Sequence, residues 1–230
     1  MNLIRKGHRR SHRGVIGVES AIVMIAFVIV AAALAFVVLN MGFSTTQKAK
    51  TAIVSSLGEA SSSLEVAGKV TGIGDVTLSN LRVVSIPLRV ASGGESINLQ
   101  NTTASIKYMS NTKEYDNIYK AALTSTTYAN ITSAFSAANS QLSAFDNGNP
   151  VTAAANAPDQ TGAIIYWSVR SNTNAILDQG EHANLAIAFR TEDKPQALDK
   201  LRIEVVVPTG AALTVERQVP SITTSVVDLG

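Results

Sequence analysis

Residues 21–39 read AIVMIAFVIVAAALAFVVL, nineteen consecutive residues without a polar side chain. If residues 15–18 are included, the apolar stretch spans 25 residues and is interrupted only by Glu19 and Ser20. At a helical rise of about 1.5 Å per residue, such a stretch crosses a hydrocarbon core of about 30 Å. Because it is apolar on every face, we expect a helix that is covered all round, by lipid or by other copies of itself.

A basic leader precedes the apolar run. Residues 1–14 contain no acid and five basic residues: Arg5, Lys6, Arg9, Arg10 and Arg13. An ordinary secretory signal has an apolar core of roughly 7–15 residues and is cleaved after it. Here the run is longer, and the candidate cleavage point, between Gly14 and Val15, lies before it. A carboxylate inside an apolar helix is costly, so Glu19 is a candidate functional residue.

Composition excludes several classes of protein. Of the 230 residues, 46% are hydrophobic and 16% are charged, which excludes a charge-rich disordered chain. The chain has no cysteine and only three histidines, His8, His12 and His182, so thiol chemistry is excluded and a Ser-His-Asp hydrolase is disfavoured. Five of the nineteen basic residues lie in the leader, which leaves fourteen against seventeen acidic ones downstream. The downstream basic residues are scattered along the chain and form no cluster, so we expect no nucleic-acid partner.

The helical pattern continues over residues 40–67. Apolar residues recur there at helical spacing between polar ones, at Ile53, Val54, Leu57, Ala60 and Leu64. We therefore expect one helix, about 75 Å long, that is apolar over residues 15–39 and amphipathic over 40–67. Gly68, Gly72 and Gly74 are expected to end it, the last two as a hinge. Such a rod is too long for a compact domain.

Residues 69–230 are predicted to form a β domain. Short runs rich in β-branched or aromatic residues are bounded by Gly, Pro, Asn and Asp at 81–86, 104–109, 163–169, 185–189, 201–207 and 213–219. About seven short strands over this length predict an immunoglobulin-like sandwich, so the fold class is α+β. Residues 124–157 are rich in Ser, Thr, Ala and Asn, with a rough helical face. We expect a surface insertion there, with a short helix or a long loop.

Two stretches resemble a known family. The basic leader ending in Gly, the apolar helix and the acid at position 19 resemble a class III signal peptide of the type IV pilin superfamily. More narrowly, GVESAIVMIAFVIVAAALAFVVLNMGFSTTQKAK (residues 17–50) is similar to the N-terminal helix of archaeal flagellins, the archaellins. LDQGE (177–181) and VPTGAALTVERQVP (207–220) are similar to the end of an archaellin. Taken from the residues alone, Asp-Gln-Gly-Glu (178–181) is a turn between strands, and Pro-Thr-Gly (208–210) is a turn into the last hairpin.

The resemblance implies a structural subunit of the archaeal motility filament, the archaellum. It implies cleavage after Gly14 by a membrane prepilin peptidase, so that the mature chain starts at Val15. It also implies self-assembly into a helical polymer, contact with the archaellum assembly and motor machinery, and an extracellular filament made from a membrane-bound precursor. Neither catalytic activity nor a cofactor is expected.

Glu19 needs a cation if it is buried. The first basic residue after the cleavage point is Lys48, over 40 Å away along a helix. Cleavage creates a positive charge at the Val15 amine, so one hypothesis pairs Glu19 with that amine, in its own subunit or in a neighbour, to set the axial register. The alternative is that Glu19 simply lies at the membrane interface, exposed to lipid headgroups.

Two other functions stay open at this stage. An adhesive type IV pilin would share the N-terminal helix, and a single-pass membrane protein with an uncleaved anchor would share the leader and the apolar run. A secreted bacterial-type flagellin is disfavoured, because it would lack both.

Other candidate sites are weaker. His182, Glu181, Asp178 and Asp193 lack the spacing of metal ligands, and we expect a solvated turn there. Some archaellins hold a metal ion in the outer domain, so a metal site stays open, with no ligands named. Two Asn-x-Ser/Thr sequons, at Asn101 and Asn130, are candidates for N-glycosylation in an extracellular filament.

Overall fold

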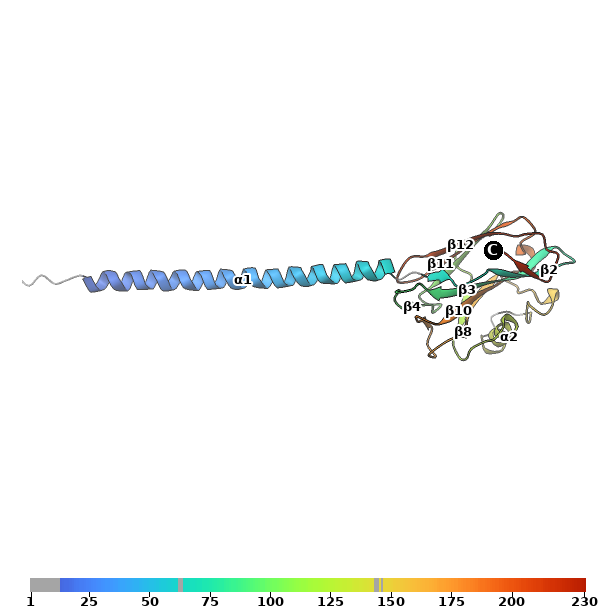
Figure 1. The fold of residues 1–230 in the computed structure, drawn as a ribbon, viewed down its shortest axis with the longest axis horizontal. Helices are drawn as coiled ribbons and strands as arrows, with labels where there is room; N and C mark the ends of the chain where they lie inside the picture. The colour runs from blue at the N-terminus through green and yellow to red at the C-terminus, as the bar shows by residue number, and fades with distance from the viewer. Residues whose placement is uncertain (1–12, 62–63, 143–144, 146) are drawn as a thin grey trace, which may run out of the picture. The chain divides into compact units, whose positions relative to one another are not determined.

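The computed structural model describes residues 13–61, 64–142, 145 and 147–230 (Figure 1). The expected leader, residues 1–14, therefore lies almost entirely outside the described residues. Contacts divide the chain into two units, Met1–Val54 and Ser55–Gly230. A long helix occupies the first unit and a β-rich domain occupies the second, so the predicted combination of a long N-terminal helix and a β domain is confirmed.

Helix α1 spans Arg13–Ser61, 49 residues and about 74 Å at the standard rise. It ends several residues before the expected boundary at 67, because Leu64–Val66 form the short strand β1. Leu64 is buried opposite Val90, in an antiparallel pairing with β3. The spacing of Leu57, Ala60 and Leu64 is helical, but Leu64 packs into the sheet core. A three-residue strand is too short to show a period of its own.

The domain contains two main sheets. The seven-stranded sheet follows the order β13-β2-β3-β10-β8-β7, with β1 also pairing with β3. Its strands are β13 (Val226–Asp228), β2 (Thr71–Asp75), β3 (Asn80–Val90), β10 (His182–Ala188), β8 (Gly162–Val169) and β7 (Tyr119–Leu123). All its pairings are antiparallel except β7 with β8, which is parallel. This parallel pair distinguishes the sheet from an all-antiparallel sandwich.

The second main sheet has four strands in the order β12-β11-β5-β6. They are β12 (Leu213–Gln218), β11 (Lys200–Val206), β5 (Ser105–Ser110) and β6 (Glu114–Tyr115). A small third sheet joins β4 (Ile97–Asn98) to β9 (Ile176–Leu177), and two 3-10 turns lie at Ala154–Asn156 and Thr191–Asp193. Six of the observed strands coincide with the six predicted runs to within a few residues.

The main core lies between the two large sheets. Ile165 and Trp167 of β8 pack there with Tyr108, Ile203 and Val205 of the smaller sheet, and all five are essentially inaccessible. The alternate residues of β8, Ile164 and Tyr166, belong to a second apolar cluster on the opposite face of the large sheet. Strand β8 is therefore buried on both faces, which explains its nearly continuous apolar sequence.

Helix α2, Ile131–Leu142, covers that opposite face. Phe135 is fully buried, and its ring lies 5.1 Å from that of Phe145. Figure 1 shows α2 on the side of β8 that faces away from β11 and β12. The expectation of a surface insertion over 124–157 was therefore wrong in one respect. The short helix is present, but it forms a third layer with its own core.

The glycines expected to end the helix, Gly72 and Gly74, lie instead in β2. A Cβ atom at Gly74 would be 2.5 Å from Ile222 Cγ2, and one at Gly72 would be 2.9 Å from Leu81 Cδ2. Both positions thus lack side chains because neighbouring apolar groups occupy the space. The hinge interpretation was wrong, since both glycines are paired with β3.

Replacing Gly74 with alanine is expected to destabilise the domain by about 1–3 kcal/mol, because the new methyl overpacks a filled site. For a domain of this size, that lowers Tm by about 3–10 °C. Thermal unfolding of the detergent-solubilised full chain, followed by circular dichroism, measures the change. Gly68→Ala is the control, since a Cβ there would meet Pro87 Cγ at an ordinary 3.6 Å. Equal Tm values for the two variants would contradict the packing argument.

Both family-like turns form as expected. In residues 178–181 the amide of Glu181 donates to the carbonyl of Asp178 at 3.1 Å, and Gly180 has a φ of +89°. The turn links β9 to β10. The Pro-Thr-Gly turn at 208–210 connects β11 to β12, and Gly210 has a φ of +97°, which favours glycine.

The C-terminal strand lies beside the start of the domain. Strand β13 pairs with β2, the Leu229 amide donates to the Val70 carbonyl at 2.9 Å, and the Val70 amide donates to the Gly230 carbonyl at 3.3 Å. Lys69 Nζ lies 2.5 Å from the Asp228 carboxylate. The first and last segments of the domain are therefore joined to each other.

Candidate assembly site

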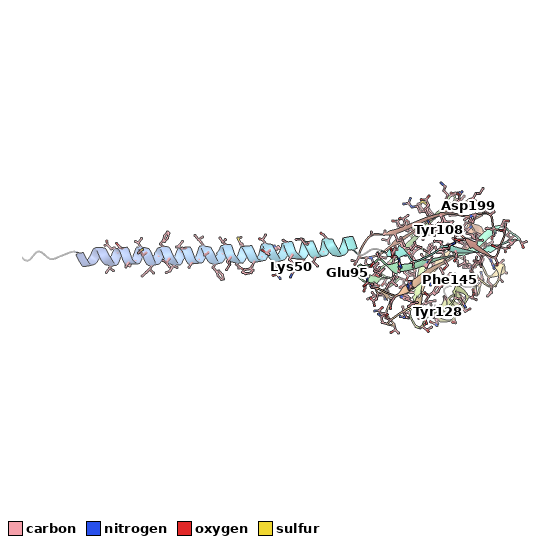
Figure 2. All side chains as sticks on the ribbon, viewed as in Figure 1. Lys50, Glu95, Tyr108, Tyr128, Phe145 and Asp199 are labelled. Atoms are coloured by element: carbon pink, nitrogen blue, oxygen red, sulfur yellow. The ribbon has the colours of Figure 1, made fainter. Side chains whose placement is uncertain are left out.

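Over residues 21–39 the surface of α1 is apolar on every side. Sixteen large hydrophobic side chains between residues 18 and 43 are exposed, among them Met24, Phe27 and Phe36, each more than 70% accessible. Figure 2 shows side chains projecting from both edges of the ribbon along the helix. Within the described residues, Gly17–Ser56 is the one helix long and apolar enough to cross a membrane.

This exposure is unfavourable in water. Burying one large aliphatic or aromatic side chain stabilises a protein by about 1.5–3 kcal/mol, so covering this helix is worth on the order of tens of kcal/mol. None of the residues that the structure describes covers this segment, which is 0% buried. The helix must therefore be satisfied by lipid, by other chains, or by each in turn.

Three threonines extend the surface that can pack against other helices beyond the apolar run. The hydroxyls of Thr45, Thr46 and Thr51 donate to the carbonyls four residues earlier, at 2.8, 2.8 and 2.9 Å. Hydroxyls bonded in this way need no water, so these residues present mainly their methyl groups to a neighbour. Sequence reasoning missed this role, although threonine at helical positions is the pattern that indicates it.

Glu19 lies near the beginning of α1 and is exposed. Gly14 and Val15 fall in the first turn of the same helix, and their side chains lie outside the description. Residues 15 and 19 are one turn apart on one helix face, about 6 Å along the axis. Lys48 lies on the same continuous helix about 43 Å away, so it cannot pair with Glu19 in one subunit. Pairing with the Val15 amine stays a prediction.

The turn at 178–181 forms, but two of the acidic residues near His182 are buried rather than solvated. Glu181 is 1% exposed, and its carboxylate accepts hydrogen bonds from the Ser171 amide at 2.6 Å and the Asp178 amide at 3.2 Å. Asp193 is also buried and accepts from Tyr115 and Thr161, both at 2.7 Å. The expectation was wrong because backbone amides and hydroxyls replace water here. Over the described residues, no group of three potential ligands is placed to hold a metal ion.

The two sequons lie on the surface of the domain. Asn101 is exposed in the turn after β4, and its Nδ2 donates to the Lys120 carbonyl at 2.9 Å. Asn130 is exposed before α2 and caps it, because its Oδ1 accepts from the Ser133 amide at 2.8 Å. Both asparagines are thus accessible from solvent, and glycosylation of either stays a prediction.

The sequence is similar to a known protein family and to proteins of that family in other archaea. The family model described as archaeal-type flagellin matches residues 14–217. "Probable flagellin 1" of Aeropyrum pernix is 36% identical over 212 residues, which cover 92% of this chain and 94% of that protein. A protein of the same name in Archaeoglobus fulgidus is 37% identical over 97 residues, covering 42% of this chain and 48% of the relative.

Two solved structures have a similar fold. The archaeal flagellum of Methanospirillum hungatei superposes with a TM-score of 0.56 at 23% identity, over 92% of this chain and 98% of that one. The crystal structure of the archaeal flagellin FlaB1 from Methanocaldococcus jannaschii gives 0.57 at 18% identity, over 73% and 96% of the two chains. With the family match over most of the sequence and an N-terminal helix that requires outside partners, the chain belongs to the archaeal-type flagellin family.

Proposed function

We propose that this chain is a structural subunit of the archaeal motility filament and polymerises through α1. The observation that carries the proposal is a helix whose first half is apolar on every face and is covered by none of the described residues, in a member of the flagellin family. The chain has no catalytic activity of its own. Its partners are further copies of itself and the assembly and motor machinery of the filament.

Assembly moves α1 from one apolar environment to another. The precursor lies in the cytoplasmic membrane, held by the apolar half of the helix. After a prepilin peptidase cleaves between Gly14 and Val15, the helix leaves the lipid and packs against the helices of other subunits. Head-to-tail contacts that do not close on themselves then produce a helical polymer with the β domains outside.

Purified filaments test this function against adhesion. Deleting the gene should remove the filament and abolish swimming, and restoring the gene should restore both. Electron cryo-microscopy of the filament should show α1 in the centre of the polymer. Cells that still swim but no longer attach to surfaces would instead identify an adhesive type IV pilin. A chain found only in the membrane, with the leader still present, would identify a single-pass anchor.

Glu19→Ala is expected to leave cleavage intact and to impair assembly. A buried carboxylate needs a nearby cation, and the pairing with the Val15 amine would fix the axial register of incoming subunits. We expect processing as in the wild type, with filament yield reduced at least tenfold or with altered helical symmetry. Intact mass and electron microscopy measure the two steps separately.

The control is Glu19→Asp, which keeps the charge and should retain most of the assembly. If Glu19→Ala gave filaments of normal yield and symmetry, the register hypothesis would fail. The alternative, in which Glu19 lies at the membrane interface among lipid headgroups, would then be favoured.

We also propose that Asn101 and Asn130 carry N-glycans in the exported chain. Both lie on the surface, and the cap at Asn130 uses Oδ1, which leaves the glycan's attachment atom, Nδ2, out of that bond. Mass spectrometry of peptides from purified filaments tests each site.

A further inference from the structure

A polar pocket lies at the β7 edge of the large sheet. It has a volume of about 320 Å³, and its lining includes Tyr115, Asn117, Lys120, Gln160, Thr161 and Arg190. These residues come from β6, the connection into β7, β7 itself and the segments next to β8 and β10. Hydroxyl, amide and cationic groups thus converge on one small cavity from three segments of the chain, 115–120, 160–161 and 190.

Among the residues that the structure describes, Lys120 has no acidic partner. Its Nζ donates to the neutral Gln160 Oε1 at 3.1 Å, and it takes part in none of the ion pairs formed by the described residues. Arg190, the second cation, pairs with Glu192 at 2.8 Å, but both side chains are largely exposed, so that pair adds little stability. Lys120 is therefore the lining cation that is left, among the described residues, to pair with the carboxylate of a ligand.

The walls of the pocket are held in place. A Cβ at Gly162 would lie 3.1 Å from Lys120 Cγ and 3.2 Å from Lys120 Cε, so the lysine stem lies directly across this glycine. Thr161 donates to the buried Asp193 carboxylate at 2.7 Å and accepts from the Arg190 amide at 3.1 Å. The Tyr115 hydroxyl donates to the same carboxylate at 2.7 Å, which raises the pKa of Tyr115 and keeps it protonated.

A sequon lies directly beside this pocket. Asn101 Nδ2, the atom to which an N-linked sugar attaches, is 2.9 Å from the backbone carbonyl of Lys120. An N-linked amide keeps one N–H, so Asn101 can still donate one hydrogen bond after glycosylation. A sugar chain starting at Asn101 would thus begin next to a pocket-lining residue. Tethering gives it an effective concentration in the millimolar range, without any need for high intrinsic affinity.

We propose that this pocket binds a carboxylate-bearing sugar of an N-glycan attached to Asn101, with Lys120 as the counter-ion. The amides of Asn117 and Gln160 then meet the sugar hydroxyls. The ligand chemistry is that of a sugar acid, which the chain's own glycan or a surrounding polysaccharide could supply. The inference rests on the proposed function only because N-glycosylation requires export.

The test measures how fast an amine-reactive acetyl ester labels Lys120. Filaments are purified from the organism that makes the chain, as wild type, Thr103→Ala and Thr103→Ser. The alanine variant removes the sequon but keeps Asn101, whereas the serine variant keeps the sequon and the hydroxyl. Mass spectrometry gives the Asn101 glycan and the extent of labelling of Lys120. Lys107, an exposed lysine on β5, serves as the internal reference.

We expect Lys120 to be labelled at least threefold more slowly in the wild type and in Thr103→Ser than in Thr103→Ala, with Lys107 unchanged. The Asn101 glycan should contain an acidic sugar. If the wild type and Thr103→Ser carry the Asn101 glycan and Thr103→Ala lacks it, equal labelling of Lys120 in the three chains would overturn the proposal. A glycan without any acidic sugar would also overturn it.

A second arm identifies the source of the sugar. Glucuronate is added to Thr103→Ala filaments, with glucose as the uncharged control. If wild-type Asn101 is unmodified, the chain's own glycan is excluded as the source. Protection of Lys120 by glucuronate alone then assigns the pocket to external sugar acids, and lack of protection overturns the site. If no filaments form at all, the proposed function fails, and the same labelling is done on the membrane-bound chain.

Discussion

Replacing Ile29 with lysine is expected to abolish filament formation. Ile29 lies in the middle of the apolar half of α1 and is 62% exposed in the single chain, so in lipid or in a polymer it faces other apolar groups. A lysine at the centre of a membrane helix costs about 3–4 kcal/mol relative to isoleucine. The same cost recurs in every subunit of a polymer. We expect filament yield to fall at least a hundredfold, measured on sheared and sedimented material by immunoblot.

Ser56→Lys is the matched control, because it adds the same side chain to the same helix beyond the apolar half. It should assemble within about twofold of the wild type. Normal filaments from Ile29→Lys would show that this face is neither embedded nor packed, and would contradict polymerisation through the apolar half.

Gly14→Val is expected to block maturation. The cleavage point proposed between Gly14 and Val15 requires a peptidase to accommodate the residue before the cut, and a β-branched side chain there is bulky and stiff. Wild-type filaments should contain a chain that starts at Val15 and lacks the fourteen leader residues. The variant should accumulate as full-length precursor in the membrane, with mature chain below a few per cent by intact-mass spectrometry.

Gly17→Val makes the same change three residues beyond the cut, where a Cβ would meet nothing within 4 Å. It should be processed normally. A wild-type chain that begins anywhere other than Val15 would refute the assignment, whatever the behaviour of the variants.

Some of the fold could be predicted because its physical cause is local. Nineteen apolar residues in a row require a covered helix whatever surrounds them, and runs such as 201–207 alternate as half-buried strands do. Strands β1 and β13 have only three residues each, too few for a period to appear. Strand β2, TGIGD, has a composition that argues against a strand, and only the side chains of Leu81 and Ile222 explain its glycines.

The candidate sites also differ in whether their cause is local in the sequence. Glu19 could be identified because a carboxylate within an apolar helix is unusual in itself. The burial of Asp193 could not, since its partners Tyr115 and Thr161 are 78 and 32 residues away in sequence. The pocket around Lys120 likewise has no motif, because three separate segments form it. Contacts of this kind depend on strand order, which hydrophobic patterns do not determine.

The junction between the first and last segments of the domain has a mechanical consequence. A subunit of a rotating filament carries load where the chain enters its β domain. There, residues 64–66 are paired with β3, the Ala67 amide donates to Pro87, and Val70 is bonded on both its polar groups to the C-terminal residues. Tension along this segment is therefore opposed by hydrogen bonds from two other parts of the domain. In the proposed filament, the C-terminal strand would thus help to hold the first residues of the domain in place when the chain is pulled.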